Sequence, residues 1–155
     1  MGVNPELPGR VYPASPVYEV GREKIREFAD AINSPDAVHR DPEAARALGH
    51  PDVIAPPTLA IIIAQRSEFQ LLQDPDTGID WSRLVHGEQR FVHHRPIVAG
   101  DRLVATPVVD KVSSMAGNDM VTTRVEIVDE QGAPVATSTS VVVIRADETA
   151  AEVAR

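Results

Sequence analysis

The sequence contains no cysteine among its 155 residues. Disulfide bonds and cysteine-based zinc sites are therefore excluded, and the absence fits a cytoplasmic protein. Apolar runs are short as well: the longest, Leu59–Ala64, is far below the roughly 18 residues that suggest a membrane-spanning helix. The N-terminus lacks the basic and then apolar segments of a signal peptide. We therefore expect neither a membrane segment nor an export signal.

Positive charge and aromatic side chains are also scarce. The 15 Lys and Arg are outnumbered by 23 Asp and Glu, so the net charge is −8, and there are only three Phe, two Tyr and one Trp. Nucleic-acid binding relies on basic patches and on aromatic rings that stack on bases. The composition therefore argues against a nucleic-acid partner, and the acidic balance mainly favours solubility.

The length and the hydrophobic content of 43% are those of one ordinary globular domain. Four prolines within residues 1–16 predict an extended N-terminal arm. The domain itself is predicted over residues 17–146, beginning with a short strand at 17–20. Residues 147–155 are polar and rich in alanine, which predicts a flexible tail.

Three helices are predicted in the first half of the chain. Helical spacing of Ile25, Phe28, Ala29 and Ile32 predicts the first, over residues 21–33. The second runs over residues 41–49, because Asp41 can cap it, Pro42 suits its first position and Gly49 can end it. The third runs from Thr58 to Gln73. Its first half is apolar on every side, so we expect other parts of the protein to enclose it.

After residue 84 the apolar residues alternate with polar ones, which is typical of strands. Strands are predicted over residues 84–94, 101–113, 120–128 and 134–145, with hairpin turns at 117–118 and 130–132. Helices followed by an antiparallel meander indicate an α+β fold. A sheet curled around one apolar helix is the hot-dog arrangement. Such a sheet has an edge strand, and pairing along that edge predicts a dimer.

Three stretches resemble the MaoC-like hydratases and dehydratases: residues 28–49, 53–60 and 91–103. The similarity is greatest to the small actinobacterial subunit of (3R)-hydroxyacyl-carrier-protein dehydratases. That subunit pairs with a second hot-dog chain that carries the catalytic residues. The resemblance implies an acyl-CoA or acyl-carrier-protein thioester as substrate, and a homodimer or a heterodimer with a second hot-dog subunit. It implies no cofactor, and the sequence contains no pattern of metal ligands.

Active members of this group carry an Asp five positions before a His on the loop after the first helix. These two side chains hold water and move the proton. His39 corresponds to the family histidine, but the position five before it is Ser34. The nearest carboxylate that could replace the missing one is Asp36. The resemblance therefore makes His39 and Asp36 the candidate catalytic residues and places Ser34 among the substrate-binding ones.

Active relatives also use an N–H group at the start of the central helix to stabilise the thioester oxygen. Where they tend to have His-Gly, this chain has Pro56-Pro57, and Pro57 has no N–H. Thr58 or Leu59 could donate instead, because the first turn of a helix leaves its N–H groups free. Pro57, Thr58 and Leu59, with Ile62 lining the acyl pocket, complete the predicted substrate-binding set.

Three functions follow from these departures. The chain is a subunit that shapes the acyl channel for a catalytic partner, a self-sufficient hydratase that uses His39 with Asp36, or an acyl-thioester-binding protein without chemistry. A thioesterase is a lesser alternative. Hot-dog thioesterases usually carry an acidic residue on the central helix, but the acid in this chain, Glu68, lies late on that helix, so the match is poor. His93 and His94 are adjacent, so on a strand they face opposite ways and do not share a metal.

Overall fold

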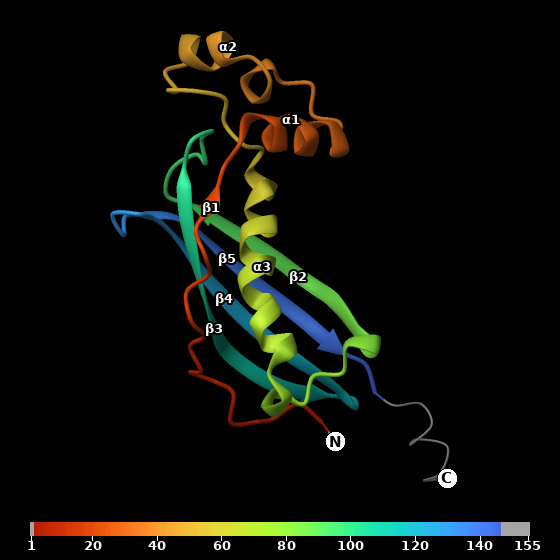
Figure 1. Ribbon diagram of the computed structural model, residues 1–155. Helices are drawn as coiled ribbons and strands as arrows, with labels where there is room; N and C mark the ends of the chain where they lie inside the picture. Colours follow the sequence, from red (N-terminus) through yellow and green to blue (C-terminus); the bar gives the residue numbers. More distant parts are fainter. Residues whose placement is uncertain (1, 147–155) are drawn as a thin grey trace.

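The computed structural model describes residues 2–146, and the predicted flexible tail of residues 147–155 lies outside the described residues. Five antiparallel strands form one curved sheet in the order β1-β3-β4-β5-β2. Helix α3 (Ala60–Gln73) crosses one face of this sheet, and two shorter helices lie together beyond one end of α3 (Figure 1). The predicted α+β hot-dog fold is confirmed.

The strands are β1 (Tyr18–Glu19), β2 (Leu84–His93), β3 (Arg102–Met115), β4 (Asn118–Asp129) and β5 (Pro134–Ile144). Each lies within a few residues of a strand predicted from the alternating pattern. The turn between β3 and β4 is Ala116-Gly117, one residue earlier than predicted, and both residues have positive φ angles of 52° and 79°. Two positive φ angles are typical of the tight hairpin turns that match the twist of the strands.

Helices α1 (Arg22–Ala31) and α2 (Pro42–Ala47) are joined by a single 3₁₀ turn, η1 (Ala37–His39). Asp41 caps α2 as predicted, because its Oδ1 accepts a hydrogen bond of 2.9 Å from the Glu43 N–H. The end predicted for the first helix is wrong: α1 stops at Ala31, and Ile32, placed in its apolar stripe, is 46% exposed.

Three further 3₁₀ turns flank α3: η2 (Pro57–Leu59) precedes it, and η3 (Pro75–Thr77) and η4 (Trp81–Arg83) follow it. The sheet curls around this helix as predicted: Ile63 and Ala64 of its apolar first half are buried, and Ile62 is half-buried. The later half is less covered, and Phe69 is 55% exposed. A single-layered sheet can cover only one side of a helix, so the other side of α3 remains open.

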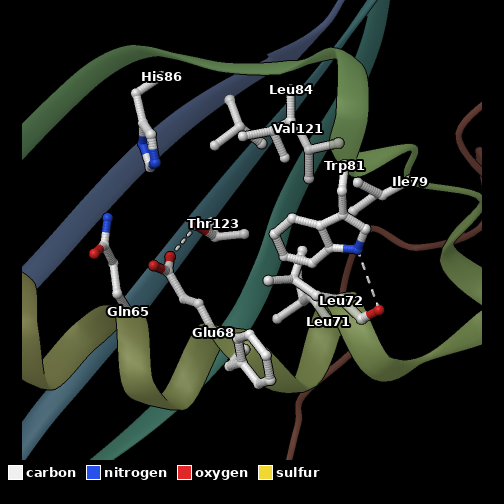
Figure 2. A pocket seen from close by; sticks show the side chains of 12 residues that line it. Gln65, Glu68, Leu71, Leu72, Ile79, Trp81, Leu84, His86, Val121 and Thr123 are labelled. Atoms are coloured by element: carbon white, nitrogen blue, oxygen red, sulfur yellow. Dashed lines mark hydrogen bonds between the residues drawn. The ribbon is translucent and has the colours of Figure 1, made fainter.

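A belt of polar side chains divides the space between α3 and the sheet. Hydrophobic clusters lie on both sides of the belt, one near the start of α3 and one near its end. Within the belt, the Gln89 amide donates to Ser138 at 2.8 Å and accepts from Ser140 at 2.6 Å. Thr123 donates to the carboxyl of Glu68 on α3 at 2.5 Å (Figure 2). These bonds satisfy polar groups that would otherwise be costly to bury.

The N-terminal arm packs on the sheet and contains two turns, at Pro5-Glu6 and Pro8-Gly9. Its backbone bonds to β3, with the Tyr12 N–H donating to the Pro107 carbonyl at 2.9 Å. Leu7 is fully buried in the hydrophobic cluster at the end of α3. At that end Asp74 accepts from the Tyr12 hydroxyl at 2.8 Å and from Arg10 at 2.9 Å. The arm thus holds the end of α3 against the sheet.

Candidate functional site

The predicted catalytic histidine lies at the end of η1 and is only 6% exposed. Its Nδ1 is 2.7 Å from the carbonyl oxygen of Ile54. Because a carbonyl oxygen only accepts, Nδ1 carries the proton, and the Nε2 of a neutral ring keeps its lone pair. An imidazole held in this tautomer can accept a proton at Nε2. The η1 turn and the chain around Ile54 therefore fix the orientation of the His39 ring.

His39 faces a groove of about 590 Å³, here called the His39 groove. Its lining comes from three segments: the η1 turn, the chain that leads into α3, and the end of β2 with the loop after it. The lining residues are Asp36, Val38, His39, Ile54, Ala55, Pro56, Pro57, His93, His94, Arg95, Pro96 and Ile97. The groove is wide enough and apolar enough to hold part of a chain-like substrate.

The two other predicted residues of the loop are placed differently. Asp36 lines the groove and is exposed, but its carboxyl makes no capping bond to η1. Ser34 is half-buried and is not part of the groove lining. Its carbonyl accepts from Arg40 at 2.7 Å, and its N–H donates to Ala29 at 2.8 Å. The structure thus brings Asp36 and His39 to one groove, and it uses the backbone of Ser34 to close the loop.

The start of α3 supplies few free donors to the groove. The Leu59 N–H donates to the Pro56 carbonyl at 2.9 Å and is therefore occupied. Pro57 has no N–H, and its carbonyl is 2.9 Å from Nε2 of His93. Of the two predicted donors, Thr58 therefore remains, but neither Thr58 nor Leu59 is among the residues that line the groove. Ile62, predicted to line the acyl pocket, packs against the hydrophobic cluster near the start of α3.

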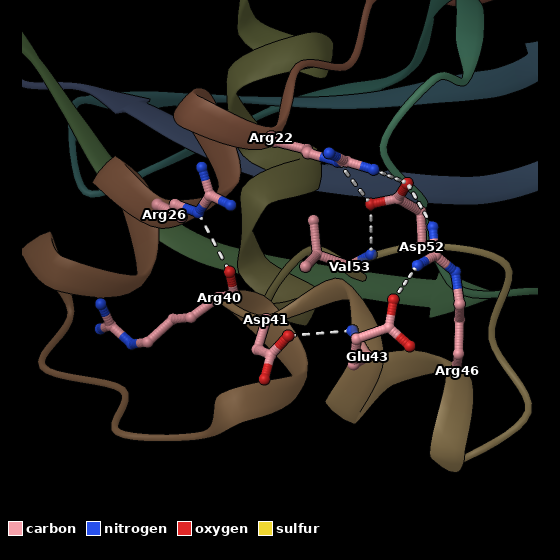
Figure 3. Close-up of polar contacts among 8 residues, drawn as sticks. All are labelled: Arg22, Arg26, Arg40, Asp41, Glu43, Arg46, Asp52 and Val53. Carbon is pink, nitrogen blue, oxygen red and sulfur yellow. Dashed lines mark hydrogen bonds and ion pairs between the residues drawn. The ribbon is translucent and has the colours of Figure 1, made fainter.

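Ionic contacts hold the segment that carries His39 to the body of the protein (Figure 3). Arg22 on α1 binds both oxygens of Asp52 at 2.9 and 2.6 Å, and the same carboxyl accepts from the Val53 N–H at 2.8 Å. Arg26 donates to the carbonyl of Arg40, one residue after His39, at 3.1 Å. These bonds tie α1, η1 and the chain before α3 into one unit.

The Arg22 guanidinium is the main reason why the pKa of Asp52 is lowered from 3.8 to about 2. A lowered pKa stabilises the folded state above the ordinary pKa, and this stabilisation disappears as the pH falls through about 2. We expect Asp52→Asn to lower the free energy of unfolding at pH 7 by roughly 1 kcal/mol, because Arg22 is 46% exposed and its attraction is screened. The difference from the parent protein should shrink as the pH falls from about 4 to 2.

Urea unfolding at several pH values measures this effect. The matched control is Glu27→Gln, which removes an exposed partner of Lys24 on the same helix and should change stability by less than about 0.5 kcal/mol. A difference between Asp52→Asn and the parent that does not vary with pH would contradict the assignment.

A comparison with known protein families identifies the family of the chain. The family described as "FAS1-like, dehydratase domain region" matches residues 6–138. The chain belongs to this family. A UPF0336 protein of Clavibacter michiganensis subsp. michiganensis is 55% identical over 148 residues, which are 96% of this chain and 99% of that protein.

Solved structures of MaoC-like dehydratases agree with the family membership. A chain of the C-terminally truncated HadBC complex, a (3R)-hydroxyacyl-ACP dehydratase of Mycobacterium tuberculosis, superposes with a TM-score of 0.81 at 32% identity, over 89% of this chain and 97% of that one. A MaoC-like dehydratase superposes with a TM-score of 0.80 at 31% identity, over 92% of this chain but 43% of the longer one. The resemblance found in the sequence is confirmed.

Within this FAS1-like dehydratase fold, a second cavity was not predicted from the sequence. It lies beside Glu68 and His86, which were given no role in the predicted function. A usable signal was present, because Glu68 lies between Ala64 and Leu71 at the spacing of the buried side of α3. A carboxyl in such a stripe is either paired or functional.

Two further observations concern the described residues of this family member. No helix within residues 2–146 is long and apolar enough to span a membrane. In the same range, no three His, Cys, Asp or Glu side chains are grouped closely enough to hold a metal ion.

Proposed function

We propose that the chain is a subunit of a cytoplasmic (3R)-hydroxyacyl-thioester dehydratase of fatty-acid metabolism, which also runs in reverse as an enoyl-thioester hydratase. In this role it shapes the acyl-binding channel for a partner chain that supplies the catalytic Asp and His. The acyl group arrives on coenzyme A or on a carrier protein. The observation that carries the proposal is the missing carboxylate: Ser34 stands where active members have Asp, and the nearest acid at the His39 groove, Asp36, is exposed.

The elimination reaction requires several groups, which is why the missing carboxylate is important. Elimination removes a proton from C2 and the hydroxyl from C3, so that one 3-hydroxyacyl thioester gives one 2-enoyl thioester and one water. A base must face C2, an acid must protonate the leaving hydroxyl, and a donor must stabilise the thioester oxygen. Here Ser34 replaces the family carboxylate, Asp36 is solvent-exposed, and the Leu59 N–H is already bonded. The chain alone therefore supplies an incomplete set of groups.

The open side of the fold supports a partner. Strand β2 is the last strand of the sheet, so one of its edges has no neighbouring strand within the described residues. Val85 and Val92 on β2 are 44% and 50% exposed, and Phe69 on the open side of α3 is 55% exposed. A long strand edge with apolar side chains is a surface that another strand can pair with. The HadBC relative is itself a complex. The proposed partner is a second hot-dog chain, or a second copy of this chain.

Replacing His39 in the assembled enzyme tests the proposal. If the partner performs the chemistry, His39→Asn should leave the turnover of a 2-enoyl thioester within about twofold, because a group that is neither base nor acid contributes little to the barrier. Asparagine is the appropriate replacement because its amide nitrogen takes the place of Nδ1 and can still donate to the Ile54 carbonyl, the contact that His39 makes at 2.7 Å. His39→Ala, which loses this contact, shows how much any effect is structural.

The same experiment also tests a second candidate function, that of a self-sufficient hydratase. One observation favours it: the bond to Ile54 leaves Nε2 of His39 free to accept a proton. With Asp36 as the accompanying acid, His39→Asn would then reduce turnover by at least about a hundredfold, the usual share of a general base. Such a loss would overturn the proposal of a channel-shaping subunit.

A further inference from the structure

The two edges of the sheet are covered to different extents. Strand β2 forms one edge, and no other strand pairs with its outer side within residues 2–146. At the opposite side, β1 pairs with only two residues of the long strand β3, Arg102 and Leu103. Beyond these residues the N-terminal arm runs along β3 (Figure 1). One edge of the sheet is therefore open, whereas the other is covered by a segment that belongs to none of the five strands.

The arm satisfies the backbone groups at the middle of the β3 edge. Val109 donates to the Arg10 carbonyl at 2.9 Å and accepts from the Gly9 N–H at 2.8 Å. The Pro107 carbonyl accepts from the Tyr12 N–H at 2.9 Å, and Pro107 has no N–H of its own. Unpaired N–H and C=O groups at a sheet edge are a template for pairing with another chain. At Pro107 and Val109 the arm leaves no such group free.

The two ends of the covered stretch are closed in different ways. At one end, Ala105 accepts from the Ser15 N–H at 2.8 Å and donates to the Ser15 hydroxyl at 3.1 Å. At the other end, the backbone bonds between the arm and β3 stop at Val109 in the described part of the chain. There the pairing of β3 with β4 shifts register between Val109 and the exposed Lys111. Such an irregularity and an exposed lysine both disfavour pairing with another chain.

The arm is attached in such a way that it can leave without breaking a pair between the five strands. Leu7 is its main anchor, because this side chain is fully buried in the hydrophobic cluster at the end of α3. The Tyr12 hydroxyl adds a bond to Asp74 at 2.8 Å. Residues 13–14 and 16–17, which lead from the arm to β1, are exposed. Loss of the Leu7 anchor would therefore free the β3 edge and keep the sheet.

We propose that the edge of β3 under the arm is a second pairing surface, that its partner is the same edge of another copy of this chain, and that the arm keeps it closed. The edge already accepts an antiparallel segment of this chain, and it carries the β-branched residues Val104, Thr106 and Val108, which suit strand pairing. The β2 edge is taken by the partner proposed above. Two β3 edges can pair antiparallel about a twofold axis, as identical surfaces do in a symmetric dimer.

This arrangement makes the arm the element that sets the size of the assembly. With the arm in place, assembly ends when the β2 edge has paired. Once the arm has left, each assembly presents a free β3 edge, and two or more assemblies join through these edges. The mass of the species in solution then rises at least about twofold, because identical edges join whole assemblies.

Leu7→Asp releases the arm in the full chain, because an unpaired carboxylate is costly in an apolar cluster. Size-exclusion chromatography with light scattering should then show the rise in mass. The matched control is Leu48→Asp, which adds the same charge at a side chain that is 70% exposed and should leave the mass unchanged.

Thr106→Lys identifies the edge that is responsible. Thr106 lies at the middle of the covered stretch and opposite Glu126 of β4, so a lysine fits the single chain. Across a pair of β3 edges, the lysines of two copies would bring like charges together, and lysine on an edge strand opposes pairing. Added to Leu7→Asp, Thr106→Lys should restore the mass of the parent protein.

A reversible crosslink returns the arm to the edge. Val11 of the arm lies opposite Val108 of β3, and the bonds beside this pair are made by Tyr12 and Val109. The Cα atoms of such a non-hydrogen-bonded pair are roughly 4.5 Å apart, a separation that a disulfide spans. The chain has no cysteine, so Val11→Cys with Val108→Cys introduces its only two thiols. In the Leu7→Asp chain, the oxidised form should have the mass of the parent, and the reduced form at least about twice that mass.

An unchanged mass of the reduced Leu7→Asp chain would overturn the inference. A large species that persists after oxidation, or in the presence of Thr106→Lys, would also overturn it, because another surface would then be responsible. Loss of the sheet signal in circular dichroism would do so as well, since the edge would not survive without its cover. The assay contains no acyl thioester, so none of these outcomes bears on the proposed dehydratase role.

Discussion

Assayed alone with a 2-enoyl thioester, the chain is expected to turn over at least about a hundredfold more slowly than when it is assembled with a hot-dog partner that carries a catalytic Asp and His, because a general base usually contributes that much or more. In the single chain Ser34 replaces the family carboxylate, and Leu59 has already used its N–H within η2. The open side of α3, where Phe69 is 55% exposed, also lacks the cover that excludes water from an acyl chain.

The loss of absorbance of the conjugated enoyl thioester measures this rate. The partner is obtained by copurification from the organism that encodes the chain, and its sequence must contain an Asp five positions before a His on the loop after its first helix. The control is the same pair with the partner's catalytic Asp replaced by Asn, which should return the rate to that of the chain alone. Full activity of the isolated chain would contradict the expectation. Saturable acyl-thioester binding without turnover in either state would indicate an acyl-binding protein.

The arm that precedes β1 is expected to be part of the stable fold. Leu7 is fully buried among Leu71, Val109 and Val121, the side chains that close the end of α3 against the sheet. Leu7→Ala should therefore lower the free energy of unfolding by about 2–5 kcal/mol, the sum of the lost burial and of the cavity that is left. Few single substitutions on the surface of the chain should approach this loss.

Urea unfolding at pH 7 measures the change. The matched control is Leu48→Ala, the same substitution at a residue that is 70% exposed, which should cost less than about 0.5 kcal/mol. Equal, small losses in both variants would mean that the arm does not pack on the sheet in solution.

The elements of the fold followed from local patterns. Strand alternation predicted β2 to β5 within a few residues, and Asp41 was identified as the cap of α2 because a side-chain oxygen before Pro42 satisfies a free N–H. The errors arose where local patterns do not apply. Ile32 fits the helical stripe, but the chain leaves the helix at Ala31. The hairpin turn after β3 comes one residue earlier than predicted, at Ala116-Gly117.

The sequence predicted only part of the candidate site, because contacts between residues that are distant in the chain do not follow from local patterns. His39 and Asp36 came from a resemblance in residue types along the chain, and the structure places both at one groove. The bond from His39 to the Ile54 carbonyl joins residues 15 positions apart, so its tautomer could not be derived from spacing. Glu68 was assigned no role in the predicted function because its hydrogen-bond partner Thr123 and the neighbouring cavity residue His86 come from two different strands.

By itself, the sequence determined the order of helices and strands, the antiparallel sheet and the family of the chain, because these depend on the periodicity and types of neighbouring residues. Only the tertiary structure decided which groups meet. Strand β2 runs back along α3, so its end lies near the start of the helix and its beginning lies near the later half. That arrangement creates the His39 groove and the cavity beside Glu68 and His86 from segments that are distant in the chain.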